Sequence, residues 1–262
     1  MTGADVDAPW PVVLIHGTRT SHSQWDLQVP SLRAAGHRVH TPDLPGHGMR
    51  RGEPFTLGSA LEVIVGAVRE ARESAGEPVH LVGSSLGGML AIAAAARLER
   101  APGVLGSLTA CGAALQPTPL SARLYGALLG GPGRLPGAGA GTVRLLTWLL
   151  GPDGARAYLR GGRADASVIA PAFSAVASLD LRAELRRIQA PVILLHGRAD
   201  QMRWDERAFA AAAPHGRIEL LPYGDHMVNL KTPGRFTADL LRVLARAQRE
   251  AAARADAHPT GP

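Results

Sequence analysis

The stretch Val79–Leu90, VHLVGSSLGGML, decides how the rest of the chain can be arranged. Its first residues form an apolar, valine-rich run that predicts a buried strand. The run stops abruptly at GSSLG, and an alanine-rich helical segment follows at once. A strand that turns sharply into a helix through small residues strains the serine at the corner and presents its hydroxyl at the top of the sheet. The pattern therefore predicts a nucleophile turn with Ser85 as the nucleophile, and Ser84 is off register by one.

Short apolar runs recur along the chain and alternate with helical patterns. We expect six strands, near residues 11, 38, 79, 104, 192 and 218. Continuous apolar runs such as PVVLI (Pro11–Ile15) and PVILL (Pro191–Leu195) are typical of parallel strands that are covered on both faces. Strands that alternate with helices indicate βαβ units. The sequence therefore predicts an α/β fold with a mostly parallel sheet of about six strands and helices on both faces.

The alternation breaks between Gly112 and Ala190, where no strong strand pattern occurs. This segment contains apolar helical candidates such as LYGALL and LLTWLL, which argue against a disordered linker. We therefore expect a helical cap at residues 113–189, inserted into a core of residues 1–112 and 190–262. Because open α/β folds bind ligands at the carboxyl edge of the sheet, the cap is expected to lie over that edge.

Two further residues are candidates to activate the serine, since a serine hydroxyl needs a histidine base and the base an orienting carboxylate. His226 lies in YGDHM, in the loop after the last predicted strand, and Asp200 ends PVILLHGRAD, just past the preceding strand. The chain order Ser85, Asp200, His226 is the order expected of this kind of nucleophile turn. We predict these residues as nucleophile, acid and base. Asp205 and Asp225 remain alternatives for the acid.

The composition indicates which classes of protein are compatible with this sequence. The chain has 262 residues, of which 46% are hydrophobic and 19% charged, as expected of one globular domain. The formal net charge is +6, but the basic residues are scattered, which argues against nucleic-acid binding. No stretch approaches the roughly 20 apolar residues of a membrane span, and the start MTGADVDAPW does not resemble a signal peptide. With Cys111 as the single cysteine, we expect a cytoplasmic protein, whose oligomeric state stays open.

Motifs that would hold a metal or another cofactor do not occur in the sequence. We find no HExxH, no pair of CxxC motifs, no P-loop and no G-x-G-x-x-G after a strand. We therefore expect a site without metal or cofactor.

The motifs VVLIHG with Trp25, TPDLPGHG, LVGSSLGG, PVILLHGRAD and GDHMVNLKTPGRF resemble those of α/β-hydrolase-fold proteins, in the serine esterase and thioesterase branch. The resemblance spans residues 11 to about 245. It implies an oxyanion hole made by the backbone N–H groups of Thr18 and Leu86. Two features depart from the family. Ser84 stands where the family often has His, and the short segment before the first strand leaves no room for the hairpin that commonly opens the fold.

The resemblance implies a serine hydrolase that cleaves a carboxylic ester, thioester or lactone of a small apolar molecule through an acyl-enzyme on Ser85. Two other interpretations stay open. The same triad can serve a non-hydrolytic or C–C-bond-cleaving enzyme such as a lyase, cyclase or perhydrolase, or a slow triad can belong to a ligand-binding signalling protein. Candidate substrate-binding residues are apolar positions in the cap and near the triad: Trp25, Leu128, Leu129, Leu145, Leu146, Trp148, Phe173 and Met227.

Overall fold

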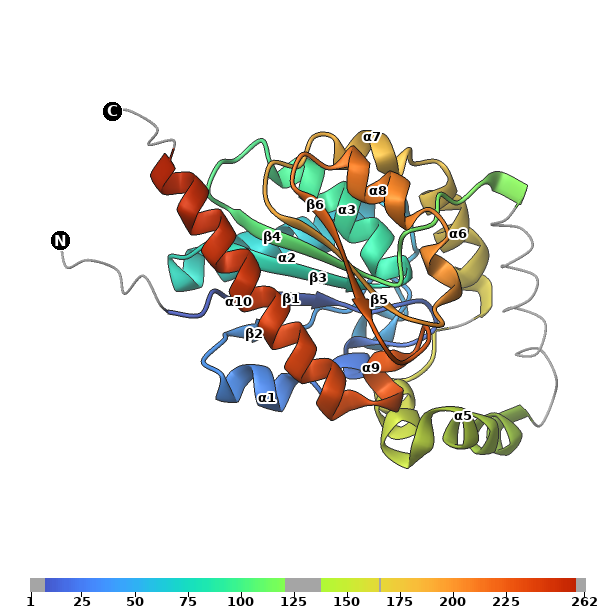
Figure 1. Cartoon of the computed structure of the whole chain (residues 1–262). Helices are drawn as coiled ribbons and strands as arrows, with labels where there is room; N and C mark the ends of the chain where they lie inside the picture. Colours follow the sequence, from blue (N-terminus) through green and yellow to red (C-terminus); the bar gives the residue numbers. More distant parts are fainter. Residues whose placement is uncertain (1–7, 121–137, 165, 258–262) are drawn as a thin grey trace.

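Six parallel strands form one sheet in the computed structural model of the chain, which describes residues 8–120, 138–164 and 166–257 (Figure 1). The strands are β1 (Val12–Ile15), β2 (Val39–His40), β3 (Val79–Ser84), β4 (Leu105–Cys111), β5 (Val192–Gly197) and β6 (Gly216–Leu221). They lie in the order β2-β1-β3-β4-β5-β6, and each neighbouring pair is parallel. The predicted fold class is confirmed. The described residues add no antiparallel strand to this sheet.

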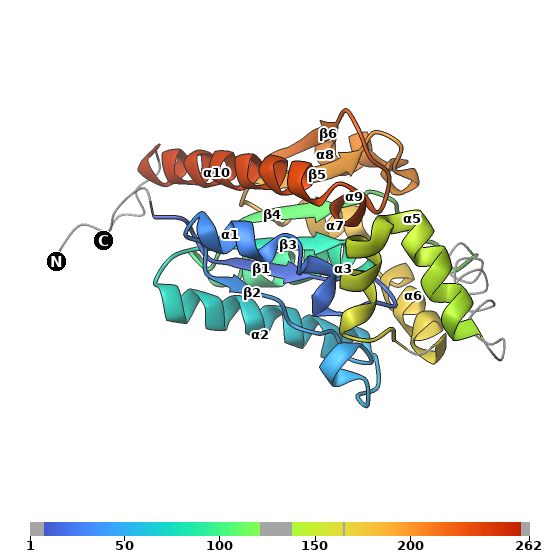
Figure 2. The ribbon, with the colours of Figure 1, turned by 90° about the horizontal axis from the view of Figure 1, so that it is seen from below.

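Alternate residues of each strand pack into two different hydrophobic clusters, because successive side chains of a strand point to opposite faces. In β1, Val13 and Ile15 belong to one cluster, whereas Val12 and Leu14 belong to the other. Helices cover both clusters, and Figure 2 shows α2 and α10 on opposite sides of the sheet. The first face is covered by α2 (Leu57–Ala75), α3 (Leu86–Leu98), α6 (Ile169–Ala177), α7 (Leu181–Leu185) and α8 (Glu206–Ala212), and the second by α1 (Val29–Ala34) and α10 (Pro233–Ala257).

Local sequence signals set the ends of α2. The side chain of Thr56 accepts a hydrogen bond from the backbone N–H of Ser59, and the Ser59 hydroxyl accepts one from the N–H of Thr56. This reciprocal pair satisfies N–H groups that have no partner inside the helix. The helix ends at Gly76, whose φ of 78° is a left-handed conformation that glycine adopts without strain.

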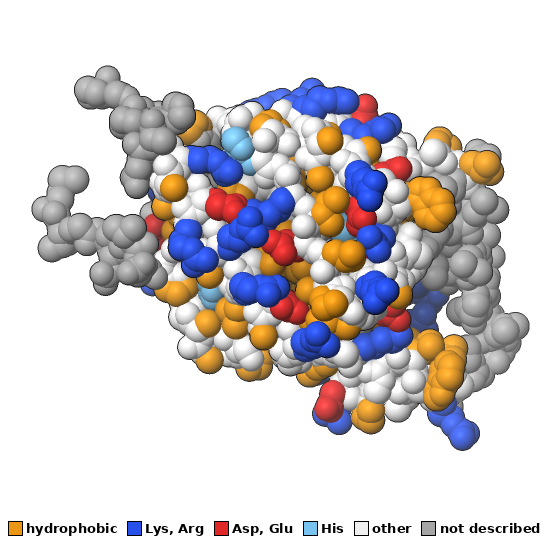
Figure 3. Space-filling model, in the orientation of Figure 1, with side chains coloured by type: hydrophobic (Ala, Val, Ile, Leu, Met, Phe, Trp, Pro, Cys, Tyr) orange, Lys and Arg blue, Asp and Glu red, His pale blue; other side chains and the backbone are white. Residues whose placement is uncertain are grey.

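Charged side chains of α10 lie over the face of the molecule seen in Figure 3, where basic and acidic groups are interspersed. Arg246 pairs with Glu250 of the same helix at 2.8 Å and with Glu219 of β6 at 3.2 Å. Exposed ion pairs of this kind add little stability. The buried side of the helix, which includes Leu240 and Leu244, therefore holds α10 on the sheet.

The segment predicted as a cap packs in two different ways. The residues of α5 (Ala138–Arg160) contact α9 (Val228–Lys231), and Figures 1 and 2 place α5 and α6 at one end of the sheet. Gly151 interrupts α5 with a non-helical φ of 74°, so the element is two helices joined at a kink. In contrast, α6 and α7 add buried residues such as Val176 and Leu185 to the main core. The division into core and cap stays a prediction.

Short 3-10 turns complete the described elements: His22–Trp25, Gly48–Arg50, Ala166–Val168 and Gln201–Arg203. None of the helices in the described ranges has the length and apolar character needed to cross a bilayer.

Candidate active site

Loops that follow four of the strands carry the predicted site residues. The chain passes from β1 outward to β2 and returns to β3 on the other side of β1, so the strand order reverses between β1 and β3. Such a reversal opens a crevice at the carboxyl edge of a parallel sheet. Ser85 follows β3, Asp200 follows β5, His226 follows β6 and Thr18 follows β1. The topology therefore brings these residues to one edge of the sheet.

Ser85 occupies a strained corner between β3 and α3. Its φ of 54° and ψ of −120° lie where a side chain is rarely found, at a typical energetic cost of about 1–3 kcal/mol. A Cβ at Gly83 would clash with the carbonyl group of Gly87, and a Cβ at Gly87 would clash with the carbonyl oxygen of His16. The N–H of Ser85 donates to the carbonyl oxygen of Cys111, 2.8 Å away in β4. The turn has the geometry expected of a nucleophile turn.

His226 joins the two other predicted residues. Its Nε2 lies 3.0 Å from Oγ of Ser85, and its Nδ1 lies 3.0 Å from Oδ1 of Asp200. Asp200 is 5% exposed, and its Oδ1 also accepts a hydrogen bond from the N–H of Met202 at 2.8 Å. Burial disfavours the charged carboxylate, but the hydrogen bonds from His226 and Met202 outweigh it and hold the pKa of Asp200 below its usual value. An ionised Asp200 fixes the proton on Nδ1 and leaves Nε2 to accept the serine proton.

The two alternative carboxylates make other contacts. Asp225 forms an ion pair with Lys231 at 2.5 Å. Asp205 accepts a hydrogen bond from the backbone N–H of Gln116 at 2.9 Å. Neither side chain has a hydrogen bond to His226 among those of the described residues, whereas Asp200 has one, and its role as the acid stays a prediction.

Gly112 makes room for the histidine and its carboxylate, a role that the sequence analysis missed. The residue follows β4 with a φ of 57°, which favours glycine. A Cβ at this position would lie 2.7 Å from Oδ2 of Asp200 and 2.8 Å from Nδ1 of His226. The sequence marks Gly112 only as the residue at which the alternation of strands and helices breaks, and that signal does not point to the triad.

Gln24 connects the loop after β1 with the nucleophile turn, and it was also missed. Its Oε1 accepts a hydrogen bond from the N–H of Gly17 at 2.7 Å, and its Nε2 donates to Oγ of Ser84 at 3.0 Å. The side chain is almost fully buried. Ser84 thus faces Gln24 and not His226. The departure at Ser84 was the one sequence signal for this contact.

The predicted oxyanion donors are Thr18 and Leu86. Leu86 is the first residue of α3, so its N–H has no acceptor inside the helix and lies at the positive end of the helix dipole. Thr18 lines the same cavity as Ser85. Their role as an oxyanion hole stays a prediction.

Two histidines stabilise the loop that follows β1. His16 Nδ1 donates to the carbonyl oxygen of Gly17 at 2.8 Å, and His16 Nε2 accepts from the N–H of Leu44 at 3.0 Å. Burial, with the nearby charge of His47, lowers the pKa of His16 to about 3, so the ring is neutral. His22 contacts the carboxylate of Asp43 through its backbone N–H at 2.6 Å and through Nδ1 at 2.9 Å.

A cavity of about 180 Å³ opens beside Ser85 and His226. Its volume is below the range of about 300–1,000 Å³ that is usual for pockets that hold drug-sized ligands. The lining residues are Gly17, Thr18, Thr20, Gln24, Ser84, Ser85, Tyr158, Phe173, Gln201, Met202, His226 and Met227. Phe173 and Met227 were predicted here, whereas Tyr158, Gln201 and Met202 were not. The site therefore suits a small molecule with a substantial apolar part.

Several other predicted pocket residues do not line this cavity. Trp148 is 80% exposed and Leu145 is 54% exposed, because they face outward from the first half of α5. Leu146 does not line the cavity itself but packs in a small cluster with Leu150, to which the lining residues Tyr158 and Met227 also belong. Trp25 is fully buried in the core on the α10 side of the sheet. The remaining two candidates, Leu128 and Leu129, lie outside the described residues.

Within the described ranges, no group of three or more His, Cys, Asp or Glu side chains is placed to hold a metal ion. Burial and the charge of Asp200 raise the pKa of the Cys111 thiol, so this cysteine stays protonated.

Known proteins resemble this chain over most of its length. The family model described as "Alpha/beta hydrolase family" matches residues 12–240. The chain is 29% identical over 250 residues to a pimeloyl-[acyl-carrier protein] methyl ester esterase of Nitrosomonas europaea, which covers 87% of this chain and 92% of that protein. A protein of the same description from Methylococcus capsulatus is 44% identical over 98 residues, which covers 37% of this chain and 35% of that protein.

Solved structures share the fold. A thermophilic esterase from Thermogutta terrifontis superposes with a TM-score of 0.73 at 22% identity, covering 91% of this chain and 90% of that chain. The enol-lactonase from Burkholderia xenovorans superposes with a TM-score of 0.66 at 23% identity. The superposition covers 91% of this chain and 92% of that chain. At such identities the likeness concerns the fold alone.

Proposed function

The chain belongs to the alpha/beta hydrolase family, and on this premise we propose that it is a serine hydrolase with Ser85 as its nucleophile. The observation that carries the proposal is the position of His226 between Ser85 and Asp200, with both contacts at 3.0 Å. This chain of contacts is what a serine needs to become nucleophilic near neutral pH.

The geometry supports the following reaction. Oγ of Ser85 attacks the carbonyl carbon of the substrate while Nε2 of His226 takes the hydroxyl proton. The negative charge that develops on the carbonyl oxygen is stabilised by the N–H groups of Thr18 and Leu86, and each donor of this kind lowers the barrier by about 3 kcal/mol. The imidazolium, held by Asp200, then protonates the leaving group. Water attacks the acyl-enzyme with the same histidine as base, and Ser85 is restored.

We propose a carboxylic ester, thioester or lactone with a small, largely apolar acyl part as the substrate. The cavity of about 180 Å³ and its apolar side chains Phe173, Met202 and Met227 support this size and character. The curated relatives of similar length are methyl ester esterases, which favours an ester. The walls of the cavity include Tyr158 from α5 and Phe173 from α6, so we propose that residues 113–189 shape the acyl site.

Labelling with a fluorophosphonate probe, followed by intact-mass analysis, tests the nucleophile. Wild-type protein should gain one adduct on Ser85, Ser85→Ala should gain none, and the matched variant Ser84→Ala should still be labelled. An adduct on Ser84 would show that the assignment is wrong. A pre-steady-state burst with p-nitrophenyl butyrate should reveal an acyl-enzyme. Ester turnover without any burst or adduct would favour base catalysis by the same triad instead.

A further inference from the structure

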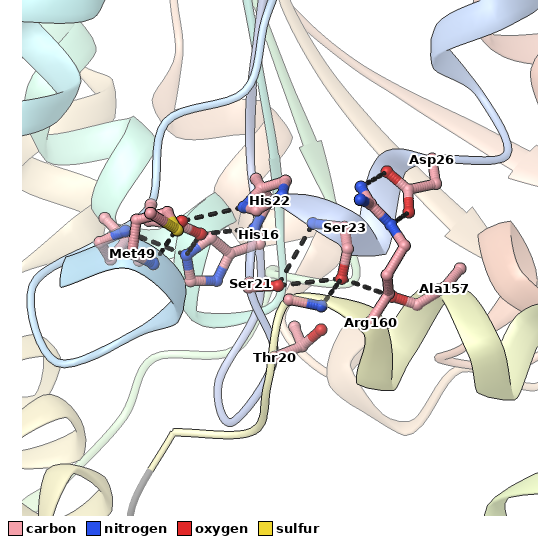
Figure 4. A network of polar contacts seen from close by, with 12 residues as sticks. His16, Thr20, Ser21, His22, Ser23, Asp26, Met49, Ala157 and Arg160 are labelled. Atoms are coloured by element: carbon pink, nitrogen blue, oxygen red, sulfur yellow. Dashed lines mark hydrogen bonds and ion pairs between the residues drawn. The ribbon is translucent and has the colours of Figure 1, made fainter. Parts of the chain in front are cut away.

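Tyr158 reaches the cavity from the second half of α5, and its backbone is held by the loop that follows β1. Thr20 Oγ1 donates to the carbonyl oxygen of Tyr158 at 3.0 Å. Ser23 Oγ donates to the carbonyl oxygen of Ala157 at 2.6 Å and accepts from the N–H of Gly161 at 3.0 Å. Figure 4 shows these hydroxyl groups of the loop turned toward the end of α5. The carbonyl groups of Ala157 and Tyr158, which flank the backbone of Tyr158, are therefore held by hydrogen bonds.

Two further contacts fix the same half-helix. Arg160 forms a bidentate pair with Asp26, with contacts of 2.5 and 2.7 Å (Figure 4). Gly154 packs so closely on α9 that a Cβ there would lie 2.6 Å from the carbonyl oxygen of Leu230. The helix is thus held between the loop after β1 and the element that follows His226. Tyr158 is consequently a fixed wall of the cavity.

The hydroxyl group of Tyr158 has no hydrogen-bond partner within the described part of the chain, although the residue lines the cavity. Tyr158 is half-buried at the cavity wall, and a tyrosine at such a boundary packs its ring on apolar neighbours while its hydroxyl donates to a polar partner. Burial raises the pKa of this phenol, against the opposing charges of Arg163 and Arg19, so the group stays a neutral donor. Thr18 Oγ1, on another residue of the same lining, is a buried hydroxyl without a hydrogen-bond partner among the described residues.

We propose that Tyr158 is a specificity residue, whose hydroxyl donates a hydrogen bond to an oxygen atom in the acyl part of the substrate. The preferred substrate class is then an ester with a short acyl chain that is apolar except for one accepting oxygen, such as a keto or ether group. The proposal rests on the proposed function and narrows its substrate class. The apolar walls formed by Phe173, Met202 and Met227 contact the carbon atoms, and Tyr158 selects the oxygen.

The test compares methyl hexanoate with methyl 4-oxohexanoate and methyl 5-oxohexanoate. Wild-type protein should prefer at least one oxo ester by about fivefold to tenfold in kcat/KM, as expected for one neutral hydrogen bond. Tyr158→Phe should lose that preference, so that its kcat/KM values for the oxo esters and for methyl hexanoate differ by less than about twofold. Tyr223→Phe is the matched control, because it removes a tyrosine hydroxyl that donates to Asp239 outside the cavity, and it should keep the preference.

Binding provides a readout that does not need turnover. In the Ser85→Ala background, calorimetry should show a dissociation constant about fivefold to tenfold lower for the preferred oxo ester than for methyl hexanoate, and Tyr158→Phe should abolish the difference. The unfolding temperature offers a second check. Since the Tyr158 hydroxyl has no protein partner to lose, Tyr158→Phe should unfold at or above the wild-type temperature, whereas Tyr223→Phe should unfold below it.

The outcomes separate the two proposals. Hydrolysis of methyl hexanoate that depends on Ser85, with no preference for either oxo ester in rate or binding, overturns the role of Tyr158 and leaves the proposed function intact. A preference that survives in Tyr158→Phe also overturns it. Absence of any hydrolysis that depends on Ser85 overturns the proposed function, and the binding comparison then still decides whether Tyr158 recognises the oxygen.

Discussion

Replacing Gly112 by alanine places a single methyl group between Asp200 and His226. The new Cβ would lie 2.7 Å from Oδ2 of Asp200, 2.8 Å from Nδ1 of His226 and 3.0 Å from its Cε1. Non-bonded carbon atoms prefer a separation of about 3.5 Å or more, so one or both side chains must move by roughly 0.5–1 Å. The contact between Nδ1 and Oδ1 is 3.0 Å long, and such a shift takes it to or beyond the limit of a hydrogen bond.

The expected loss of activity follows from the role of the carboxylate. In the well-studied serine triads, an acid that no longer holds the histidine tautomer lowers kcat by about 10⁴-fold. Partial displacement should cost less, and we expect Gly112→Ala to lower kcat by about 10²–10³-fold, which is about 3–4 kcal/mol of barrier. Stability should fall separately by about 1–2 kcal/mol, because alanine is strained at a φ of 57°.

A matched control separates strain from contact. Gly103 has a φ of 77°, and a Cβ there would meet no atom within 4 Å. Gly103→Ala should therefore lose stability to a similar extent while its kcat stays near the wild-type value. Steady-state hydrolysis of p-nitrophenyl butyrate, with urea unfolding of each variant, measures both quantities. If folded Gly112→Ala turns over within about threefold of wild type, the carboxylate does not act as the geometry indicates.

Three other changes test the site and its surroundings. Asp200→Asn should lower kcat by about 10²–10⁴-fold because an amide does not stabilise the imidazolium. The kcat of Asp225→Asn should stay within about threefold of the wild-type value. The reverse result in steady-state kinetics would move the acid role to Asp225. Gln24→Ala should lower kcat about tenfold at nearly constant KM, since it leaves an N–H of the predicted oxyanion loop without its acceptor, and an unchanged kcat would contradict this role. Burial lowers the pKa of His80 to about 3, whereas the pKa of an unfolded histidine is near 6.5. Between these two pH values the unfolded chain binds a proton at His80 and the folded chain does not. The free energy of unfolding therefore falls as the pH falls from about 6.5 toward 3. At pH 5 the free energy of unfolding lost through His80 is about 2 kcal/mol. Urea unfolding at pH 7.5 and 5.0 should show a smaller loss of stability in His80→Gln than in the wild type. An equal loss in both proteins would refute the role of His80.

Sequence patterns located the triad candidates because each of them lies at or just after the end of a predicted strand. Strand runs such as PVVLI and PVILL fix where the chain crosses the sheet, and parallel strands deliver the residues after them to one edge. Ser85, Asp200 and His226 therefore meet although they lie far apart in sequence. The local glycines at 83 and 87 additionally fix the turn that holds Ser85.

The same reasoning failed where side-chain direction depends on tertiary packing. LLTWLL has apolar residues on several sides of its helix, and only the side with Leu146 and Leu150 meets a neighbouring element. Trp148 is left exposed because no described residue covers that side. Gly112 and Gln24 were missed for a related reason. Their roles depend on atoms brought close by distant strands, and no local pattern encodes that closeness.

The contacts at the second half of α5 argue against a strict separation of catalytic core and substrate-selecting cap. Thr20 and Ser23, which hold the backbone around Tyr158, belong to the same loop as Thr18, the predicted oxyanion donor. A displacement of this half-helix would move the loop with it, since each hydrogen bond joins the two directly. The loop in turn is joined to the nucleophile turn through Gln24. The wall that is proposed to select the substrate and the donors that are proposed to stabilise the oxyanion therefore form one hydrogen-bonded unit, and substitutions in α5 should alter kcat as well as substrate preference.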